Sequence, residues 1–188
     1  LGLGGSRGSL RNLPQMAVQI CALMRAAAKG PLRVMFPMVT DIEDWDSAMP
    51  VVDYCRRKLT ERGVEFEPDV PFGVMLSVPA ACLTAEDFTA HGCRFFVIGT
   101  NDLTQYIMAA DRGNSTVAEL VDYRNDAVIN AIAMVCQAGR NNEIPVSMCG
   151  EMAGDIQQTA RLLTMGIDKL SASPSRLPAL KAAIRTSH

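Results

Sequence analysis

The chain has 188 residues, of which 48% are hydrophobic and 20% are charged, and its formal net charge is -2. This composition is typical of a globular domain, and the near-neutral charge gives no electrostatic reason to expect binding to nucleic acid or to an anionic membrane. No apolar run is long enough to span a bilayer, and the opening segment lacks the basic and apolar regions of a secretory signal. We therefore predict a cytoplasmic protein without a membrane span.

Cysteines are scattered singly along the chain, and no Cys-x-x-Cys pair occurs. The only histidines in the sequence are His91 and His188, so the residue spacing of a metal site is absent. Most of the cysteines lie in apolar stretches, where a free thiol packs as a small hydrophobic group. We expect reduced thiols with mainly structural roles, with Cys149 as an exception.

Apolar runs and helical patterns alternate along the chain. The first helix is expected from Pro14 to Gly30, where apolar residues recur with helical spacing. The Thr-x-x-Glu pattern at Thr40–Glu43 matches a capping box and begins a helix that ends near Arg62. Short, almost uniformly apolar strands are expected over 33–38, 72–77, 95–99, 145–149 and 169–172. Further helices are expected to begin at Pro79, to follow a polar stretch after Gly99, and to cover 126–139, 156–165 and 175–185.

This alternation predicts an α/β fold with a parallel sheet buried on both faces. The pattern leaves two architectures open, an open doubly wound sheet and a closed (β/α)8 TIM barrel. Leu1 to Leu3 could be the end of a sixth strand. Because a complete barrel needs about 250 residues, a barrel here would be incomplete, with about the last six βα units and without its first two strands. Residues 1–188 would then be one barrel domain of a larger multidomain protein.

Polar residues of unusual kinds follow four of the expected strands. They are Gly4–Arg7, Ser77, Asn101-Asp102 and Cys149–Glu151. In α/β folds the active site is built at the carboxyl ends of the parallel strands. We therefore expect these four positions to lie at one functional edge of the sheet.

Asn101 and Asp102, in the segment GTNDLTQY, offer an amide that can donate to an anion and a carboxylate suited to a hard cation such as Mg²⁺. On local chemistry alone, a helix cap or an Asx turn explains the pair equally well. Downstream, the DRGN turn carries Arg112, whose guanidinium could hold a phosphate or a carboxylate through two parallel hydrogen bonds. Taken alone, Arg112 is more simply a solvated surface residue.

Cys149, in the segment MCGEMAGD, directly follows an expected strand. It could be a nucleophile, a proton donor or a packed thiol. No histidine is near it in sequence, so an activated thiolate has no support. A neutral thiol that acts as a general acid stays open, because the reference pKa of cysteine, about 8.5, leaves the thiol protonated at neutral pH.

Short segments occur along the chain in the order LGxxxxR, MFPM, PAA, IGTNDLTQY, DRGN and MCGEMAGD. Together they resemble the C-terminal domain of enzyme I of the bacterial phosphoenolpyruvate-dependent sugar phosphotransferase system. Enzyme I-like segments of multiphosphoryl transfer proteins resemble the chain equally well. The resemblance runs through essentially the whole chain. Pyruvate phosphate dikinases and phosphoenolpyruvate synthases share the TND and CGE segments, whereas DRGN looks more like enzyme I.

The resemblance implies a (β/α)8 barrel that binds phosphoenolpyruvate and Mg²⁺ at the carboxyl ends of its strands. It implies that Asn101 and Asp102 contact the substrate, that Asp102 also holds the metal, and that Arg112 clamps the anionic groups of the substrate. Cys149 matches the residue that protonates the enolate carbon to give pyruvate. The implied partners are a phosphohistidine on a separate N-terminal domain, a phosphocarrier protein and a second copy of the chain in a homodimer.

Two positions depart from the family pattern. Ser77 stands where the family usually has the glutamate that is its second metal ligand. Gly4 stands where the family usually has an arginine, so that Arg7 alone is left of the GxRxxR pattern. A serine hydroxyl is a weaker Mg²⁺ ligand than a carboxylate, so we expect weakened binding of metal and phosphate.

The leading interpretation is therefore an enzyme, the substrate-binding portion of a phosphoenolpyruvate–protein phosphotransferase. No phosphoacceptor histidine motif is present, so we expect no autophosphorylation by this chain alone. Ser77 and Gly4 favour a different class, an enzyme I-like module that binds phosphoenolpyruvate or partners without turnover. A dikinase or synthase barrel is disfavoured by DRGN.

Overall fold

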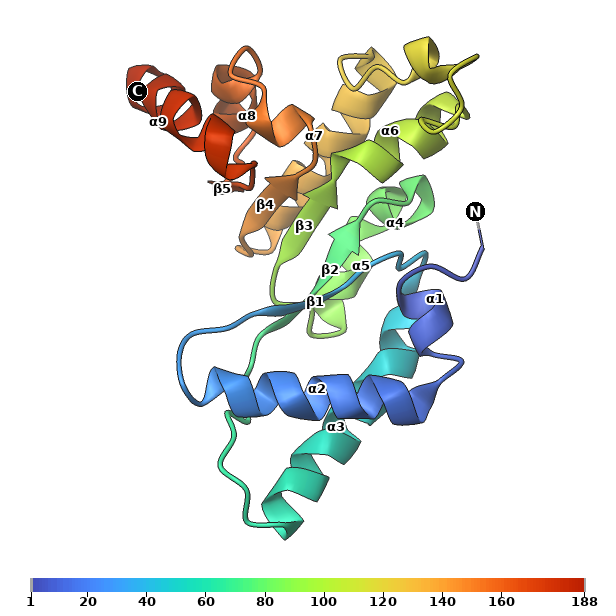
Figure 1. The fold of residues 1–188 in the computed structure, drawn as a ribbon, viewed down its shortest axis with the longest axis vertical. Coiled ribbons are helices and arrows are strands. Elements are labelled where there is room, and N and C mark those ends of the chain that lie inside the picture. Colours follow the sequence, from blue (N-terminus) through green and yellow to red (C-terminus); the bar gives the residue numbers. More distant parts are fainter. Residues whose placement is uncertain (1, 188) are drawn as a thin grey trace.

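The fold is that of a computed structural model that describes residues 2–187, and Figure 1 shows its arrangement. The strands are β1 (Val34–Phe36), β2 (Phe72–Leu76), β3 (Phe96–Gly99), β4 (Val146–Cys149) and β5 (Lys169–Leu170). The α-helices are α1 (Ser6–Ser9), α2 (Leu13–Ala27), α3 (Ile42–Glu61), α4 (Pro79–Leu83), α5 (Ala85–Ala90), α6 (Thr100–Met108), α7 (Asp126–Asn141), α8 (Thr159–Thr164) and α9 (Leu177–Thr186). Short 3-10 turns are η1 (Ala118–Leu120), η2 (Met152–Gly154) and η3 (Pro174–Arg176).

The strands form one parallel sheet in the order β1-β2-β3-β4-β5, which is also their order in the chain. A doubly wound sheet would reverse its strand order at a switch point, and no such reversal occurs within residues 2–187. Each β–α–β connection instead adds the next strand on the same side of the previous one. The predicted α/β fold with a parallel sheet is confirmed, and the sheet is singly wound.

The two faces of this sheet differ in burial. Val74 and Phe96 lie on the face covered by helices, and both are 0% exposed. The opposite face carries Met75, Val97 and Ser147, which pair across β2, β3 and β4 and are only partly buried. Successive residues of a strand point to opposite faces, so this alternation follows directly from the pleat.

The helix-covered face packs into one apolar core. α7 contributes Val128, Ile132 and Val135, whose spacing places them on one side of the helix. From α3, Trp45 is fully buried, and its indole N–H donates to the carbonyl of His91 at 2.9 Å. α2 and α3 pack side by side at one end of the molecule (Figure 1). No helix within residues 2–187 is long and apolar enough to cross a membrane.

The capping box of α3 is displaced by one residue from its predicted position. Asp41, rather than Thr40, is the N-cap, and it accepts a hydrogen bond from the Asp44 N–H at 3.1 Å. The carboxylate of Asp44 accepts from the Thr40 N–H at 2.8 Å, which completes the reciprocal pair. The Thr40 hydroxyl instead accepts from the guanidinium of Arg7 at 2.8 Å.

Other boundaries differ from the sequence-based expectation in three places. Gly2 and Leu3 are not in a strand, and Leu1 lies outside the described residues. The helix expected over 156–165 begins only at Thr159, because Asp155 accepts a hydrogen bond from the Gln157 N–H and holds a turn before it. α6 begins directly after β3 without an intervening polar stretch.

Candidate functional site

The carboxyl ends of strands β2, β3 and β4 lie side by side, at the partly buried face of the sheet. Gly99 and Cys149 are partners in the parallel register, and Ser77 follows β2 directly. A Cβ atom on Gly99 would lie 3.0 Å from the Cβ of Ser77, so the absence of a side chain allows these strand ends to approach. Three of the positions predicted from sequence therefore lie at one edge.

Asn101 and Asp102 lie in the first turn of α6. The N-cap of this helix is Gly99 and no side chain caps it, so the interpretation of the pair as a helix cap is wrong. Asn101 Oδ1 instead accepts a hydrogen bond at 2.9 Å from the N–H of Glu151, just beyond β4. The unpaired N–H groups and positive dipole at the start of a helix favour an anion. The pair is thus placed for ligand contact.

A second hydrogen bond joins the ends of β3 and β4. The hydroxyl of Thr100, which is 1% exposed, donates to the carbonyl of Cys149 at 2.9 Å. Gly150 follows with a φ of 98°, in the left-handed region that favours glycine. A Cβ on Gly150 would lie 2.3 Å from the Thr100 hydroxyl oxygen. The turn after Cys149 is therefore tightly fixed against the start of α6.

Arg112 lies over this edge in the segment that follows α6. Its Nη2 is 3.2 Å from Asp102 Oδ1, and the two side chains are 50% and 34% exposed. Its backbone N–H donates to Gln105 Oε1 at 3.0 Å, which positions the turn against α6. An exposed ion pair of this kind adds little to stability. The effect of the ion pair is to place the guanidinium beside Asn101 and Asp102.

The Cys149 thiol is half-buried at the same edge. Burial, and secondly the negative charge of Asp102, raises the pKa of Cys149 above its ordinary value. A raised pKa keeps the thiol protonated at neutral pH. The site therefore suits a proton donor and does not support a thiolate nucleophile.

A cavity of about 200 Å³ opens beside these residues. Its lining combines predicted site residues with others from the segment after α6 and from the turn after β4: Asn101, Thr104, Arg112, Ala118, Val121, Tyr123 and Glu151. Sequence reasoning assigned no role to Tyr123, whose hydroxyl donates to Asp155 Oδ2 at 3.0 Å. That bond ties the segment carrying Arg112 to the segment carrying Glu151. The MCGEMAGD motif could have indicated Glu151 as a site residue, whereas no sequence motif pointed to Tyr123.

Other predicted positions lie at the edge without joining this cluster. The segment of Gly4 and Arg7 meets the end of β1, where the Ser6 N–H donates to the Pro37 carbonyl at 2.9 Å. Arg7 is hydrogen-bonded to Thr40, as described above, and Gly4 is exposed. Both lie at the β1 side of the edge, away from the bonds that join β3 to β4.

The residues of the site do not supply the two-carboxylate magnesium site that the family resemblance implies. Ser77 is 0% exposed, and its hydroxyl is directed to the sulfur of Met38 at 3.9 Å. Within residues 2–187 no group of three or more His, Cys, Asp or Glu side chains could hold a metal ion. Asp102 is the one carboxylate at the predicted metal position, since Ser77 replaces the second.

His91 lies away from the site, in the turn between α5 and β3, at the end of the sheet where the strands begin. Its Nδ1 is 2.9 Å from the carboxylate of Asp46, and both side chains are about half exposed, 44% and 50%. His188 lies outside the described residues. The structure thus gives His91 a surface hydrogen bond to α3.

Comparison with known proteins shows which family the chain resembles in sequence. A family model described as "PEP-utilising enzyme, PEP-binding domain" matches residues 1–188. Proteins named phosphoenolpyruvate-protein phosphotransferase are 43% identical to this chain in Haloferax volcanii, 37% in Cupriavidus necator and 38% in Haemophilus influenzae. These matches cover 96%, 100% and 98% of this chain, but only 33%, 32% and 32% of the relatives. The chain therefore spans about a third of the length of these curated relatives.

Solved structures with low sequence identity share the fold. A citrate lyase from Burkholderia xenovorans is similar with a TM-score of 0.65 and 19% identity, over 89% of this chain and 53% of that one. An HpcH/HpaI aldolase/citrate lyase family protein from Burkholderia cenocepacia has a TM-score of 0.58 and 18% identity, over 88% and 69%. These likenesses concern the fold alone. From the match over the full chain and the identity to its relatives, this chain belongs to the PEP-binding domain family of PEP-utilising enzymes.

Proposed function

We propose that this chain is the phosphoenolpyruvate-binding portion of a phosphoenolpyruvate–protein phosphotransferase of the sugar phosphotransferase system. The observation that carries the proposal is the convergence of Asn101, Asp102, Arg112 and Cys149 at the carboxyl ends of β3 and β4. These four residues combine an anion-binding helix start, a guanidinium and a neutral thiol. That set matches the chemistry needed to hold a small phosphorylated acid and to protonate its carbon.

In this proposal Arg112 and the start of α6 hold the anionic groups, and Asn101 fixes the turn after Cys149 through Glu151. The phosphorus–oxygen bond of the substrate breaks as a histidine nitrogen of another domain bonds to phosphorus, and a phosphocarrier protein receives the group later. The enolate left behind takes the proton of the Cys149 thiol at carbon and becomes pyruvate. Solvent then returns a proton to the thiolate. Positioning and charge stabilisation, the main requirements of phosphoryl transfer, come from the strand ends.

The remaining parts of the proposal concern the assembly around the site. We assign residues 1–188 to one domain, an incomplete (β/α)8 barrel, which the sequential parallel strand order supports. We also propose that the whole protein acts in the cytoplasm as a homodimer. Size-exclusion chromatography with light scattering of the full-length protein tests the dimer.

The substitutions at Ser77 and Gly4 favour a second function, in which the site binds phosphoenolpyruvate without efficient turnover. The observation behind it is that Ser77 is buried against Met38 and supplies no carboxylate. When bound, Mg²⁺ would neutralise phosphate charge, and Asp102 is the residue that could contact it. No step above depends on the metal.

Isothermal titration with phosphoenolpyruvate tests the substrate assignment. We expect Asn101→Ala to weaken binding at least roughly tenfold, because it removes the amide and frees the turn carrying Cys149. The matched control is Asn142→Ala, at the opposite end of the sheet, where the amide donates to the Ala138 carbonyl. Equal affinities of the two variants, with circular dichroism showing both folded, would contradict the proposal.

A further inference from the structure

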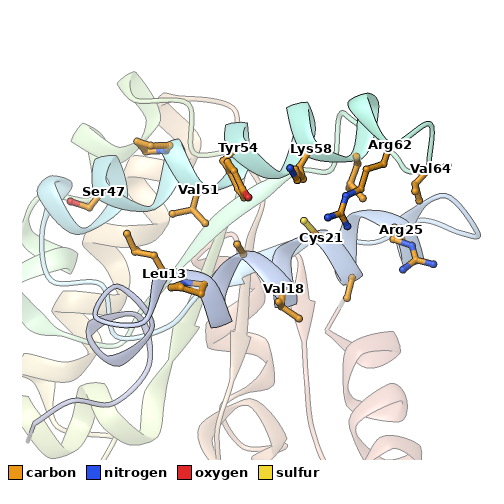
Figure 2. A pocket seen from close by; sticks show the side chains of 15 residues that line it. Leu13, Val18, Cys21, Arg25, Ser47, Val51, Tyr54, Lys58, Arg62 and Val64 are labelled. Carbon is orange, nitrogen blue, oxygen red and sulfur yellow. The ribbon is translucent and has the colours of Figure 1, made fainter.

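The helices α2 and α3 enclose an open groove of about 800 Å³, remote from the carboxyl edge (Figures 1 and 2). Apolar side chains such as Val18 and Tyr54 line its walls, and these two are 70% and 47% exposed. Arg25, Lys58 and Arg62 line the same groove and gather toward one end in Figure 2. Solvent therefore has direct access to the space between the two helices.

Cys21 lies in this groove, and Figure 2 shows its sulfur between α2 and α3. Cys55 lies on α3, is 0% exposed, and its thiol donates to the carbonyl of Ala17 at 3.3 Å. In an α-helix that carbonyl also accepts the N–H four residues later, which here belongs to Cys21. The Cys55 thiol is thus seated beside the backbone of Cys21, on the helix that faces its own.

The pair differs from the other cysteines of the chain. Cys82, Cys93 and Cys136 are buried, and none of them has another cysteine as a described partner. Cys149 belongs to the site at the carboxyl edge. The dithiol of Cys21 and Cys55 therefore combines one thiol that faces a solvent-filled groove with one that lies behind it.

We infer that Cys21 and Cys55 form a redox dithiol, which hydrogen peroxide converts into a disulfide between α2 and α3. The Cys21 sulfur attacks one peroxide oxygen, the O–O bond breaks, and a sulfenic acid and one water form. The Cys55 thiol then attacks the Cys21 sulfur, the S–O bond breaks, and the second water leaves with the proton of the thiol. Two thiols are oxidised by two electrons, and the peroxide is reduced to two waters.

The surroundings explain the order of these steps. Cys21 is reached first because it lines the groove, whereas Cys55 is fully buried. Burial is the largest cause that raises the pKa of Cys55, to about 12, so Cys55 stays a protonated, protected thiol until the neighbouring sulfur is activated. The disulfide would join the two helices covalently at the floor of the groove.

Peptide mapping under non-reducing conditions after treatment of the whole chain with hydrogen peroxide tests this inference. We expect a peptide pair linked through Cys21 and Cys55, lighter by two hydrogens, that dithiothreitol separates. We also expect the thermal midpoint of the oxidised chain to rise by several degrees relative to the reduced chain, because the link constrains the unfolded state. The Cys82→Ser variant is the matched control and should give the same linked pair.

Single substitutions separate the two roles. In Cys55→Ser the reaction should stop at a sulfenic acid on Cys21, which dimedone labels, and in Cys21→Ser no linked pair should form. Because Cys55 is buried, the less buried Cys21→Ser variant keeps the test valid if Cys55→Ser does not fold. Oxidation of wild-type Cys21 to sulfinic acid without a link to Cys55, or a link of either cysteine to another partner, would overturn the inference. None of these outcomes depends on phosphoenolpyruvate binding.

Discussion

The two halves of the carboxyl edge of the sheet differ in their hydrogen bonds and charged side chains. At β3 and β4, two hydrogen bonds join the strand ends, and Asp102 and Arg112 lie within 3.2 Å of each other. At β1 and β2, the corresponding positions hold Ser77, which is directed to a methionine sulfur, and Arg7, which is bonded to a threonine hydroxyl. The first half has charged groups free to meet a ligand, and the second has little charge left for one.

This difference separates two tasks that the family resemblance assigns to one pocket. In the proposed function, binding the substrate anion and protonating its carbon would depend on groups at the ends of β3 and β4, which lie together in the structure. Holding a metal would depend on a second carboxylate after β2, where this chain has Ser77. Each task is attached to its own strand end, so one can change without disturbing the fold that supports the other.

The largest expected effect comes from filling the tight turn of the complete half. Gly150→Ala should lower the free energy of unfolding by about 3 kcal/mol, because its Cβ would meet the Thr100 hydroxyl at 2.3 Å in a left-handed backbone. Gly92→Ala is the matched control, since Gly92 also has a positive φ but open space around it, and should lose about 1 kcal/mol. Urea denaturation of both variants measures the difference. Equal losses would show that strain alone, without the β3–β4 contact, explains the glycine.

A smaller effect is expected from the guanidinium of the same half. Arg112→Lys keeps the charge but removes the planar fork, and should weaken phosphoenolpyruvate binding roughly tenfold with little change in stability. Arg124→Lys provides the comparison, because Arg124 is likewise paired with an exposed aspartate, Asp122, at 2.9 Å. Calorimetric titration of both variants with phosphoenolpyruvate measures the difference in affinity. Unchanged affinity in Arg112→Lys would place the substrate anion elsewhere on the edge.

An effect of similar size, but a gain, is expected in the half that carries Ser77. Ser77→Glu should make phosphoenolpyruvate binding depend on Mg²⁺ by roughly tenfold, because it returns a carboxylate near Asp102. Ser77→Ala should leave binding unchanged with or without the metal, since the hydroxyl contacts only a thioether at 3.9 Å. Titration of each variant with phosphoenolpyruvate, once in the presence of Mg²⁺ and once with a chelator, measures the dependence of affinity on the metal. A strong magnesium requirement in the unsubstituted chain would mean that the two halves are not separate.

The strands and most helices follow from sequence because their signals are local. Uniform apolar runs located all five strands described in residues 2–187, and the face carrying Val128, Ile132 and Val135 located α7. The order of the strands was left open, because apolar runs do not state which strand lies beside which. Pairing between segments far apart in the chain showed that the five described strands lack the reversed order of a doubly wound sheet.

The site was predictable to the extent that it depends on strand ends. Asn101, Asp102 and Cys149 come together because parallel strands finish at one edge. Tyr123 escaped prediction, since the segment after α6 has no periodic pattern and its position depends on the bond to Asp155. The start of α3 is another case in which a contact between distant residues could not be read from local sequence. Thr40 and Asp41 are both good caps, and the structure has Asp41 as the cap while the Thr40 hydroxyl accepts from the distant Arg7.

Because the strands pair in chain order, β1 and β5 are the two outer strands of the described sheet. The outer strand of a parallel sheet presents unpaired backbone N–H and C=O groups unless another strand or segment covers it. β5 is short and carries the exposed Lys169, and a charged side chain there discourages further strand addition. β1 has only Val34, Met35 and Phe36, with no charge among them. Of the two outer strands described, β5 thus carries a charged side chain and β1 does not.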